Sequence, residues 1–262
     1  MMCPKVSVAK ASFGALGAAL CLLLALLLVS GCDRGSGVHN PQDPFEPINR
    51  RIYEFNDMLD RAVLKPVALD YLAVVHAPAR TMVSNFFSNL DDVTVTLNDM
   101  LQFKPAQAMA DFWRVLTNTT LGVFGLVDTA SASGFEKHHE DFGQTLGHWG
   151  VESGPYVMLP LFGPSSVRDG IGFVIDHNLS PLSTHHPTIA RRQTRLIKTV
   201  SLRSNLLPLQ GVLDEQPDQY SYLRYFYLQR RQSLVYDGNP PRERYEDDDE
   251  DSAPMQSKIG RR

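Results

Sequence analysis

Residues 83–101 read VSNFFSNLDDVTVTLNDML, and this stretch decides the fold class. Apolar side chains recur in it at every third or fourth position: Val83, Phe86, Phe87, Leu90, Val93, Leu97 and Leu101. That spacing places them on one face of an α-helix, so we predict a long amphipathic helix here. Asp91 and Asp92 interrupt the stripe, and we interpret them as a solvated edge of this helix rather than as a catalytic pair of carboxylates.

Helical spacing continues on both sides of this stretch. An earlier apolar stripe consists of Ile48, Ile52, Phe55 and Leu59. Pro105 can open a further helix, because proline is favoured in the first helical turn. The apolar face of that helix carries Met109, Phe112, Trp113 and Leu116. Ser166 and Asp169 form a possible capping box, and residues 188–206 and 217–235 are expected to form two more helices.

Strand signals are few in this sequence. Residues 156–162 are apolar, but Pro160 interrupts the run and Gly163-Pro164 ends it. The sequence shows no repeat at a fixed period. We therefore predict a mostly α protein with a single helical domain over residues 43–238.

The first 31 residues have the order of a secretory signal. Two lysines precede an apolar run over residues 11–29, and the run ends in Val29-Ser30-Gly31-Cys32. This exit is similar to the lipobox of bacterial lipoproteins, in which the cysteine receives a diacylglyceryl group. We therefore expect a signal peptide over residues 1–31 and lipid attachment at Cys32. An uncleaved membrane anchor or an ordinary signal peptide is the alternative.

The composition fits a lipid-anchored chain. All three cysteines lie within the first 32 of the 262 residues, so a mature chain from Cys32 has no internal disulfide and no cysteine-based zinc site. Removing the two signal lysines changes the formal net charge from −4 to −6. A pI near 6.0 argues against a nucleic-acid binder. We expect residues 32–42 to be a polar tether and residues 239–262 to be a disordered acidic tail.

The common motifs of enzymes are absent from the sequence. Residues 163–167 fail at the last position of the Gly-x-Ser-x-Gly nucleophile elbow, and neither HExxH nor a Walker loop occurs. The run His138-His139-Glu140-Asp141 could suggest a metal site. Neighbouring residues on a helix point about 100° apart, however, and we interpret the run as a solvated or turn-forming cluster. We predict no enzymatic activity, no cofactor and no metal.

Two segments are unusual for an ordinary helical domain. Residues 142–172 combine seven glycines and three prolines with large apolar side chains, which suits a hairpin or a surface in a membrane interface. The other segment carries five basic side chains: Arg191, Arg192, Arg195, Lys198 and Arg203. Such a helix suits anionic lipid headgroups. A solvated helix face is the alternative.

Several motifs follow one another in a recognisable order. Residues 43–50 read DPFEPINR, residues 85–90 read NFFSNL, and residues 141–147 read DFGQTLG. The last block continues through Trp149-Gly150, Gly154-Pro155-Tyr156, Leu159-Pro160, Gly163-Pro164 and Arg168-Asp169, and the pattern ends over residues 220–238. In these motifs, and over residues 43–238, the sequence resembles the MlaA (VacJ) family of outer-membrane phospholipid-transport lipoproteins.

The resemblance implies a ring-like arrangement of amphipathic helices that lies in the inner leaflet of the outer membrane. It implies an amphipathic channel through which mislocalised phospholipids leave the outer leaflet. The expected partners are phospholipids, a trimeric outer-membrane porin and a periplasmic phospholipid carrier similar to MlaC. A lipoprotein that scaffolds a porin without moving lipid is the alternative. Asp33 resembles an inner-membrane retention signal of enteric bacteria, but the family favours the outer membrane.

We expect residues 150–169 to form part of the lipid path or its rim. The candidates are Gly154, Pro155, Tyr156, Leu159, Pro160, Gly163, Pro164, Arg168 and Asp169. The glycines and prolines are expected to shape the backbone, while Arg168 and Asp169 are candidates for polar contacts with lipid. A capping and salt-bridge role at the start of a helix is the alternative for these two residues.

Overall fold

The computed structural model describes residues 40–184 and 188–241. The expected signal peptide, Cys32 and most of the tether and acidic tail lie outside these ranges. The elements are α2 (Glu46–Leu59), η1 (Asp60–Leu64), α3 (Lys65–Val74), α4 (Ala77–Leu101), α5 (Pro105–Thr120), α6 (Thr129–Ala132), α7 (Phe142–His148), β1 (Tyr156–Leu159), β2 (Gly163–Ser166), α8 (Val167–Leu179), α9 (Pro181–Thr184), α10 (Thr188–Leu206), η2 (Leu207–Leu209), α11 (Gln210–Asp214) and α12 (Gln219–Val235).

The predicted mostly α, single-domain fold is confirmed. The stripe at residues 83–101 lies in α4, Pro105 begins α5, and α10 has the predicted bounds. Ser166 caps α8, because its side chain accepts a hydrogen bond from the backbone N–H of Asp169. No helix in the described part of the chain is long and apolar enough to cross a membrane.

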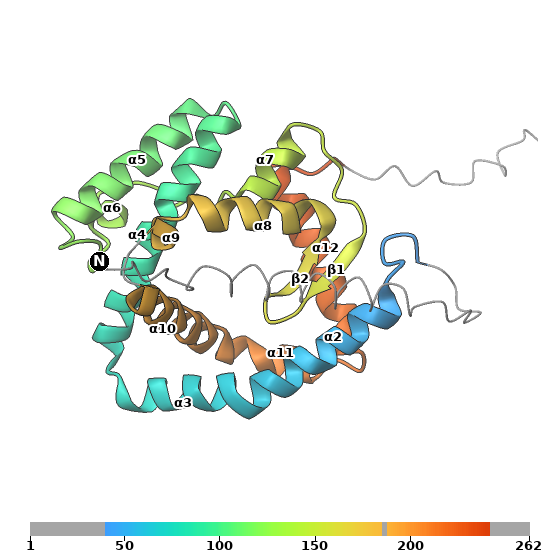
Figure 1. The fold of residues 1–262 in the computed structure, drawn as a ribbon. Helices are drawn as coiled ribbons and strands as arrows, with labels where there is room; N and C mark the ends of the chain where they lie inside the picture. The colour runs from blue at the N-terminus through green and yellow to red at the C-terminus, as the bar shows by residue number, and fades with distance from the viewer. Residues whose placement is uncertain (1–39, 185–187, 242–262) are drawn as a thin grey trace, which may run out of the picture.

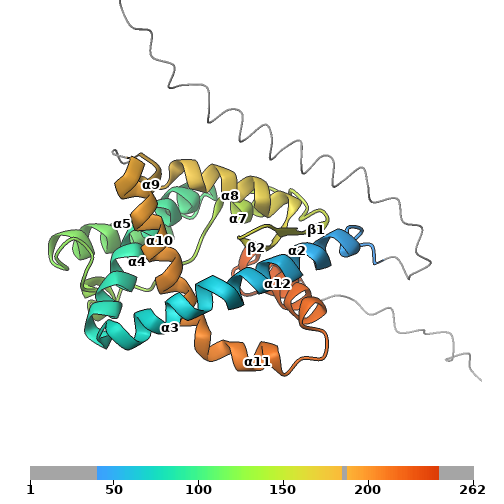
Figure 2. The same ribbon diagram turned by 60° about the horizontal axis from the view of Figure 1, so that its bottom comes forward.

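The helices follow one another around a ring-like outline (Figures 1 and 2). α2, η1 and α3 form one side, α4 turns away from α3, α8 lies opposite, and α12 and the strands lie next to α2. α10 crosses between α3 and α4 and packs on both, while α5 packs on the outer side of α4. Arg203 of α10 holds the π-helical turn η1 through an ion pair of 2.7 Å with Asp60.

The strand prediction needs a correction at Pro160. The apolar run does not simply break there; it forms a hairpin in which β1 and β2 pair antiparallel, with Tyr156 opposite Ser166 and Leu159 opposite Gly163. Residues 160–162 make the turn. Leu161 and Gly163 have positive φ angles of 69° and 88°, a conformation that glycine adopts more readily than leucine.

The buried side chains are mostly polar and many large apolar side chains are exposed, which is the reverse of the usual arrangement in a water-soluble domain. Within the described ranges, 19 buried residues are polar or charged and only nine are apolar. Large apolar residues lie on the surface, for example Phe103, Leu121 and Phe124, which are 84%, 73% and 74% exposed. A large apolar surface of this kind marks a protein that contacts lipid or another protein.

The predicted apolar face of α5 shows this reversal clearly. Met109, Phe112, Trp113 and Leu116 all point outward and are exposed. The opposite face of the same helix is buried and carries Ala108, Asp111, Arg114 and Asn118. The helical period was therefore predicted correctly, and the polar face is the one that packs against the rest of the protein.

Candidate functional site

Arg231 of α12 joins the starts of two other helices. Its guanidinium contacts the carboxylate of Asp141, the N-cap of α7, at 2.6 and 2.9 Å, and that of Asp169, in the first turn of α8, at 2.9 Å. Tyr227 and Arg168 also donate to Asp169. Burial alone would raise the pKa of Asp169, but the hydrogen bonds from Arg231 and Tyr227 outweigh burial and lower it.

A second polar cluster fastens the hairpin to α2. The Asn49 amide accepts from the N–H of Met158 at 2.9 Å and donates to the carbonyl of Tyr156 at 3.1 Å. Seven residues later on α2, Asn56 makes the same pair of contacts with Leu159 and Leu161, at 3.0 and 2.8 Å. Residues seven apart share one helix face, so α2 pairs with the hairpin through side-chain amides.

The carboxylate of Asp43 completes this cluster. It accepts hydrogen bonds from Asn49 at 2.8 Å, from the hydroxyl of Tyr220 at 2.6 Å and from Arg224 at 2.7 Å. Tyr156 packs edge-on against Tyr220 within the same small core. The polar signature at residues 43–50 thus has a structural role in positioning β1.

A third cluster corrects our interpretation of Asp92. This residue is not at a solvated helix edge: it is fully buried, next to the equally buried guanidinium of Arg114 at 3.4 Å, and it also pairs with Lys137. Arg114 further donates to the backbone carbonyl of Phe135 at 2.6 Å and contacts Asp128 at 3.3 Å. Asp91 does lie at the surface, where it pairs with Lys198.

The run from His138 to Asp141 is not a solvated cluster either. Glu140 is buried, where it accepts a hydrogen bond from Gln102 at 2.8 Å and pairs with Lys104 at 3.3 Å. The Nδ1 atom of His138 lies 2.8 Å from a carboxylate oxygen of the fully buried Asp111. In the described ranges no three His, Cys, Asp or Glu side chains are grouped so that they could hold a metal ion.

Asp99, close to this cluster, lies fully buried on α4. Burial, the neighbouring carboxyl of Asp111 and the charge of Glu140 raise the pKa of Asp99 to about 8. Asp99 is therefore mostly protonated at neutral pH, and its hydroxyl can donate to Asp111. A charged pair of carboxylates in this interior would cost far more free energy.

The predicted lipid-path residues gather around the hairpin. Gly154, with a positive φ of 66°, precedes β1, while Tyr156 is fully buried in the core. Pro160 is in the turn, and the carbonyl of Pro155 accepts a hydrogen bond from the N–H of Val167. Arg168 and Asp169 are almost completely buried and hold the helix-start interactions described above.

Three of the predicted residues line one cavity of about 220 Å³. Its lining consists of Asp141, Leu159, Phe162, Pro164, Ser165, Asp169, Phe173, Asp176, Tyr227 and Arg231. The cavity is amphipathic, because its aromatic side chains lie beside three carboxylates and one guanidinium. It can therefore contact both a polar and an apolar part of the same molecule.

The residues that hold this arrangement together were not predicted to do so from the sequence. Arg114 and Arg231 each bridge two acidic side chains from other segments, and Asn49 and Asn56 hold the hairpin. The signals in the sequence are an arginine within the pattern of α5 and two asparagines spaced by seven on α2. Both signals identify a helix face, but neither identifies the partner.

The fold and these clusters define a class: a mostly helical, single-domain protein with an ion-paired polar interior and an apolar exterior. The family model described as MlaA lipoprotein matches residues 41–234. The chain belongs to the MlaA lipoprotein family.

Named relatives and a solved structure agree with this assignment. The Escherichia coli (strain K12) protein named intermembrane phospholipid transport system lipoprotein MlaA is 35% identical over 239 residues, covering 87% of this chain and 94% of the relative. The Haemophilus influenzae protein of the same name is 32% identical over 163 residues, 60% of this chain and 65% of the relative. A structure solved to explain the maintenance of bacterial outer membrane lipid asymmetry matches with a TM-score of 0.66 and 34% identity, over 74% of this chain and 98% of that one.

Proposed function

We propose that this protein maintains the lipid asymmetry of the outer membrane by removing mislocalised phospholipids from the outer leaflet. The phospholipids pass through an amphipathic channel in the helical domain to a periplasmic carrier. This proposal rests mainly on the burial of polar side chains and the exposure of apolar ones. An apolar exterior around a polar, ion-paired interior suits a protein that lies in lipid and guides a charged headgroup. The relatives named as phospholipid-transport lipoproteins support the same function.

The proposed location is the inner leaflet of the outer membrane, with lipids on Cys32 as the anchor. Several acyl chains on one cysteine bind a membrane stably, whereas a single chain binds reversibly. The exposed apolar faces of α4, α5 and the segment 121–127 would add to this attachment. Replacing Cys32 with alanine should release the protein from outer-membrane fractions or slow its maturation.

The hairpin and the cavity beside it are proposed as part of the lipid path. The cavity brings the predicted Leu159, Pro164 and Asp169 next to the aromatic rings of Phe162 and Phe173. A headgroup crossing an apolar barrier needs polar partners, and its acyl chains need an apolar wall. This cavity has both kinds of surface.

The test is a clean deletion of the gene, with outer-leaflet phospholipid measured by labelling of intact cells. We expect more phospholipid in the outer leaflet and greater sensitivity to detergent, and complementation should reverse both. Unchanged lipid asymmetry in the deletion strain would contradict the proposed function.

A lipoprotein that only scaffolds a trimeric porin is the second candidate, and it is separated from lipid removal by point variants. Leu159→Asp and Phe162→Asp place charge in the cavity, and the control variant Glu54→Gln changes an exposed residue of α2 outside it. Loss of lipid removal with retained porin binding in the first two variants supports transport. Loss of function only when porin binding is lost supports the scaffold.

The proposed transport breaks no bond in the phospholipid. The purified protein, incubated with radiolabelled phospholipid in detergent, should release neither fatty acid nor lysolipid. Release of either product at a rate proportional to protein concentration would instead identify a hydrolase.

A further inference from the structure

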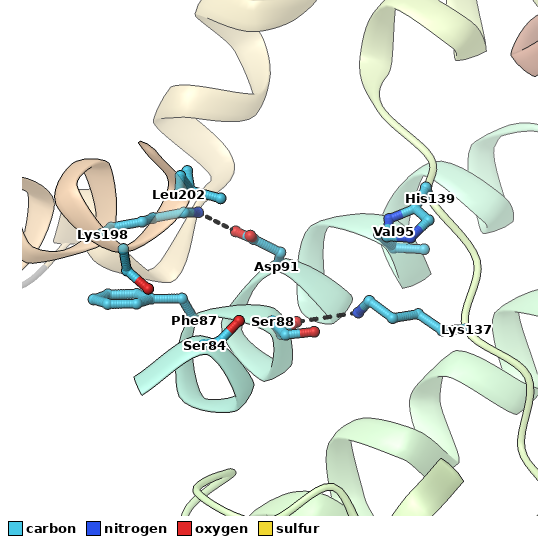
Figure 3. A pocket seen from close by; sticks show the side chains of 10 residues that line it. Ser84, Phe87, Ser88, Asp91, Val95, Lys137, His139, Lys198 and Leu202 are labelled. Atoms are coloured by element: carbon cyan, nitrogen blue, oxygen red, sulfur yellow. Dashed lines mark hydrogen bonds and ion pairs between the residues drawn. The ribbon is translucent and has the colours of Figure 1, made fainter. Parts of the chain in front are cut away.

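A separate cavity of about 210 Å³ lies between α4 and α10 (Figure 3). Two lysines from different segments reach it: Lys198 from α10 and Lys137 from the segment after α6. Lys198 pairs with Asp91, and Lys137 pairs with Asp92 and donates to the backbone carbonyl of Ser88 at 3.5 Å. Both lysine side chains are about one-quarter exposed, so the cavity is open to a ligand.

We propose that this cavity binds the phosphate group of a glycerophospholipid and that Lys137 and Lys198, which line it, supply the positive charge. This inference rests on the proposed transport function and assigns it a headgroup site. Ammonium groups and hydroxyls are strong hydrogen-bond donors to phosphate oxygens, and Ser84, Ser88 and Ser201 add three hydroxyls to the lining.

The size and the apolar part of the lining favour a headgroup over a whole lipid. Pockets that enclose a drug-sized ligand measure about 300–1,000 Å³, so two acyl chains do not fit in 210 Å³. Phe87 and Leu202 line the same cavity, and Leu202 is 53% exposed. These side chains can contact the glycerol and the first methylene groups, while the acyl chains stay outside.

The ion pairs already present allow the lysines to exchange partners. Asp92 keeps Arg114 at 3.4 Å when Lys137 turns toward phosphate, so no buried carboxylate is left alone. The Asp91 side chain is 48% exposed and can return to solvent when Lys198 moves. Partial burial and the charge of Lys137 lower the pKa of His139, so this residue is mostly neutral at pH 7.

Residues of α4 contact the linings of both cavities. Val95 lines the headgroup cavity, and Asn98, less than one turn further along, donates to Asp176 of the cavity beside the hairpin at 3.1 Å. Lysines are in excess in the first cavity and carboxylates in the second.

The experiment measures lipid binding by the full, detergent-solubilised chain with native mass spectrometry. The ligands are phosphatidylglycerol, phosphatidylethanolamine, diacylglycerol without phosphate, and inorganic phosphate. We expect Lys137→Gln and Lys198→Gln each to weaken binding of both phospholipids about tenfold, the effect of losing one charge-assisted hydrogen bond. Binding of diacylglycerol should not change.

Three further variants make the test specific. Lys198→Arg should retain most of the affinity for both phospholipids. Asp91→Asn should raise the affinity for phosphatidylglycerol, because it frees Lys198 from its ion pair. Arg51→Gln removes an exposed charge from α2, away from this cavity, and should change nothing. Circular dichroism should show that all variants melt like the wild type.

The outcomes separate this site from the wider function. Equal phospholipid affinity in the wild type and both lysine variants overturns the site and leaves transport standing. Displacement of phospholipid by millimolar inorganic phosphate identifies a site for a free anion and also overturns the proposal. A wild-type chain that binds no phospholipid contradicts the proposed function itself.

Discussion

Arg231 pairs with the carboxylates at the starts of both α7 and α8. In Arg231→Gln, Asp169 keeps only Arg168 as a charged partner in a buried position. Because an uncompensated buried charge is costly, we expect the free energy of unfolding to fall by about 2–4 kcal/mol. Thermal or denaturant unfolding in detergent measures this loss. Arg230→Gln, at the exposed neighbouring position, should have almost no effect, and equal stability of the two variants would contradict the role of Arg231.

Asp99 should make stability depend on pH. Its pKa is about 8 in the folded protein and near the ordinary 3.8 in the unfolded chain, so the unfolded chain loses this proton first. The contribution of Asp99 to the free energy of unfolding therefore decreases as the pH rises from about 4 to about 8. Asp99→Asn should remove that part of the slope, and Asp214→Asn, at an exposed position, should keep it. Parallel pH profiles for wild type and Asp99→Asn would show that Asp99 does not hold the proton.

At the residue scale, the sequence predicted helix faces and not the environment of each face. Asp92 interrupts an apolar stripe, and in a water-soluble protein that position would be solvated. Its actual partners, Arg114 and Lys137, lie 22 and 45 residues away along the chain. Only the tertiary fold brings them together, so the burial of Asp92 could not be predicted from local spacing.

At the element scale, α7 and α8 cross so closely that one position requires glycine. A Cβ atom added at Gly172 would lie 2.3 Å from the backbone nitrogen of Gly143, whereas one at Gly170 would lie 3.7 Å from its nearest neighbour, the Oγ of Ser165. Gly172→Ala should therefore separate the helices and destabilise the protein. Gly170→Ala should be neutral or stabilise it by up to about 1 kcal/mol, because alanine favours helix.

Denaturant unfolding of the two alanine variants, side by side, measures the difference. Helix propensity alone would shift both midpoints in the same direction, since both glycines lie inside α8. Stabilisation of both variants would show that the backbones separate easily, and it would contradict a tight crossing.

Elements that are determined by neighbouring residues were predicted from the sequence, and elements that depend on distant residues were not. Pro105 and Ser166 mark helix starts through their own backbone and side chain, and both starts were predicted. The hairpin depends on Asn49 and Asn56, which contact it from more than 100 residues away. Its strands have only four residues each, too few for a clear alternating pattern. The local sequence therefore indicated a turn but not the contacts with α2 that hold the hairpin.

At the scale of the whole molecule, the apolar exterior predicts where the two tryptophans lie in a bilayer. Trp113, on the outer face of α5, is 45% exposed, and Trp149 is 50% exposed with its indole N–H bonded to the carbonyl of Leu101. In liposomes that contain brominated acyl chains, we expect the fluorescence of Trp113 to be strongly quenched. Tryptophan surrounded by lipid should also emit at shorter wavelength.

Single-tryptophan variants make this measurement unambiguous. Trp149→Phe reports Trp113 alone, and Trp113→Phe reports Trp149 alone. Quenching of Trp113 by aqueous iodide, with no effect of brominated lipid, would place α5 in water and contradict an apolar exterior in contact with acyl chains.

The direction of the apolar faces is the property of the whole molecule that periodicity did not reveal. A repeat of 3.6 residues separates two faces of a helix but does not state which one packs inward. On α5, the face of Phe112 and Trp113 is exposed and the face of Asp111 and Arg114 is buried. The direction follows only from the structure, in which the polar face is buried.

The reversed burial also affects how such a sequence can drift during evolution. A position that faces acyl chains needs only an apolar side chain, so many replacements are acceptable there. An interior position such as Asn49 or Asp169 must keep both its shape and its hydrogen-bonding partners, so a single replacement needs a second one elsewhere. Distant relatives should therefore share their buried polar residues and differ in their apolar ones.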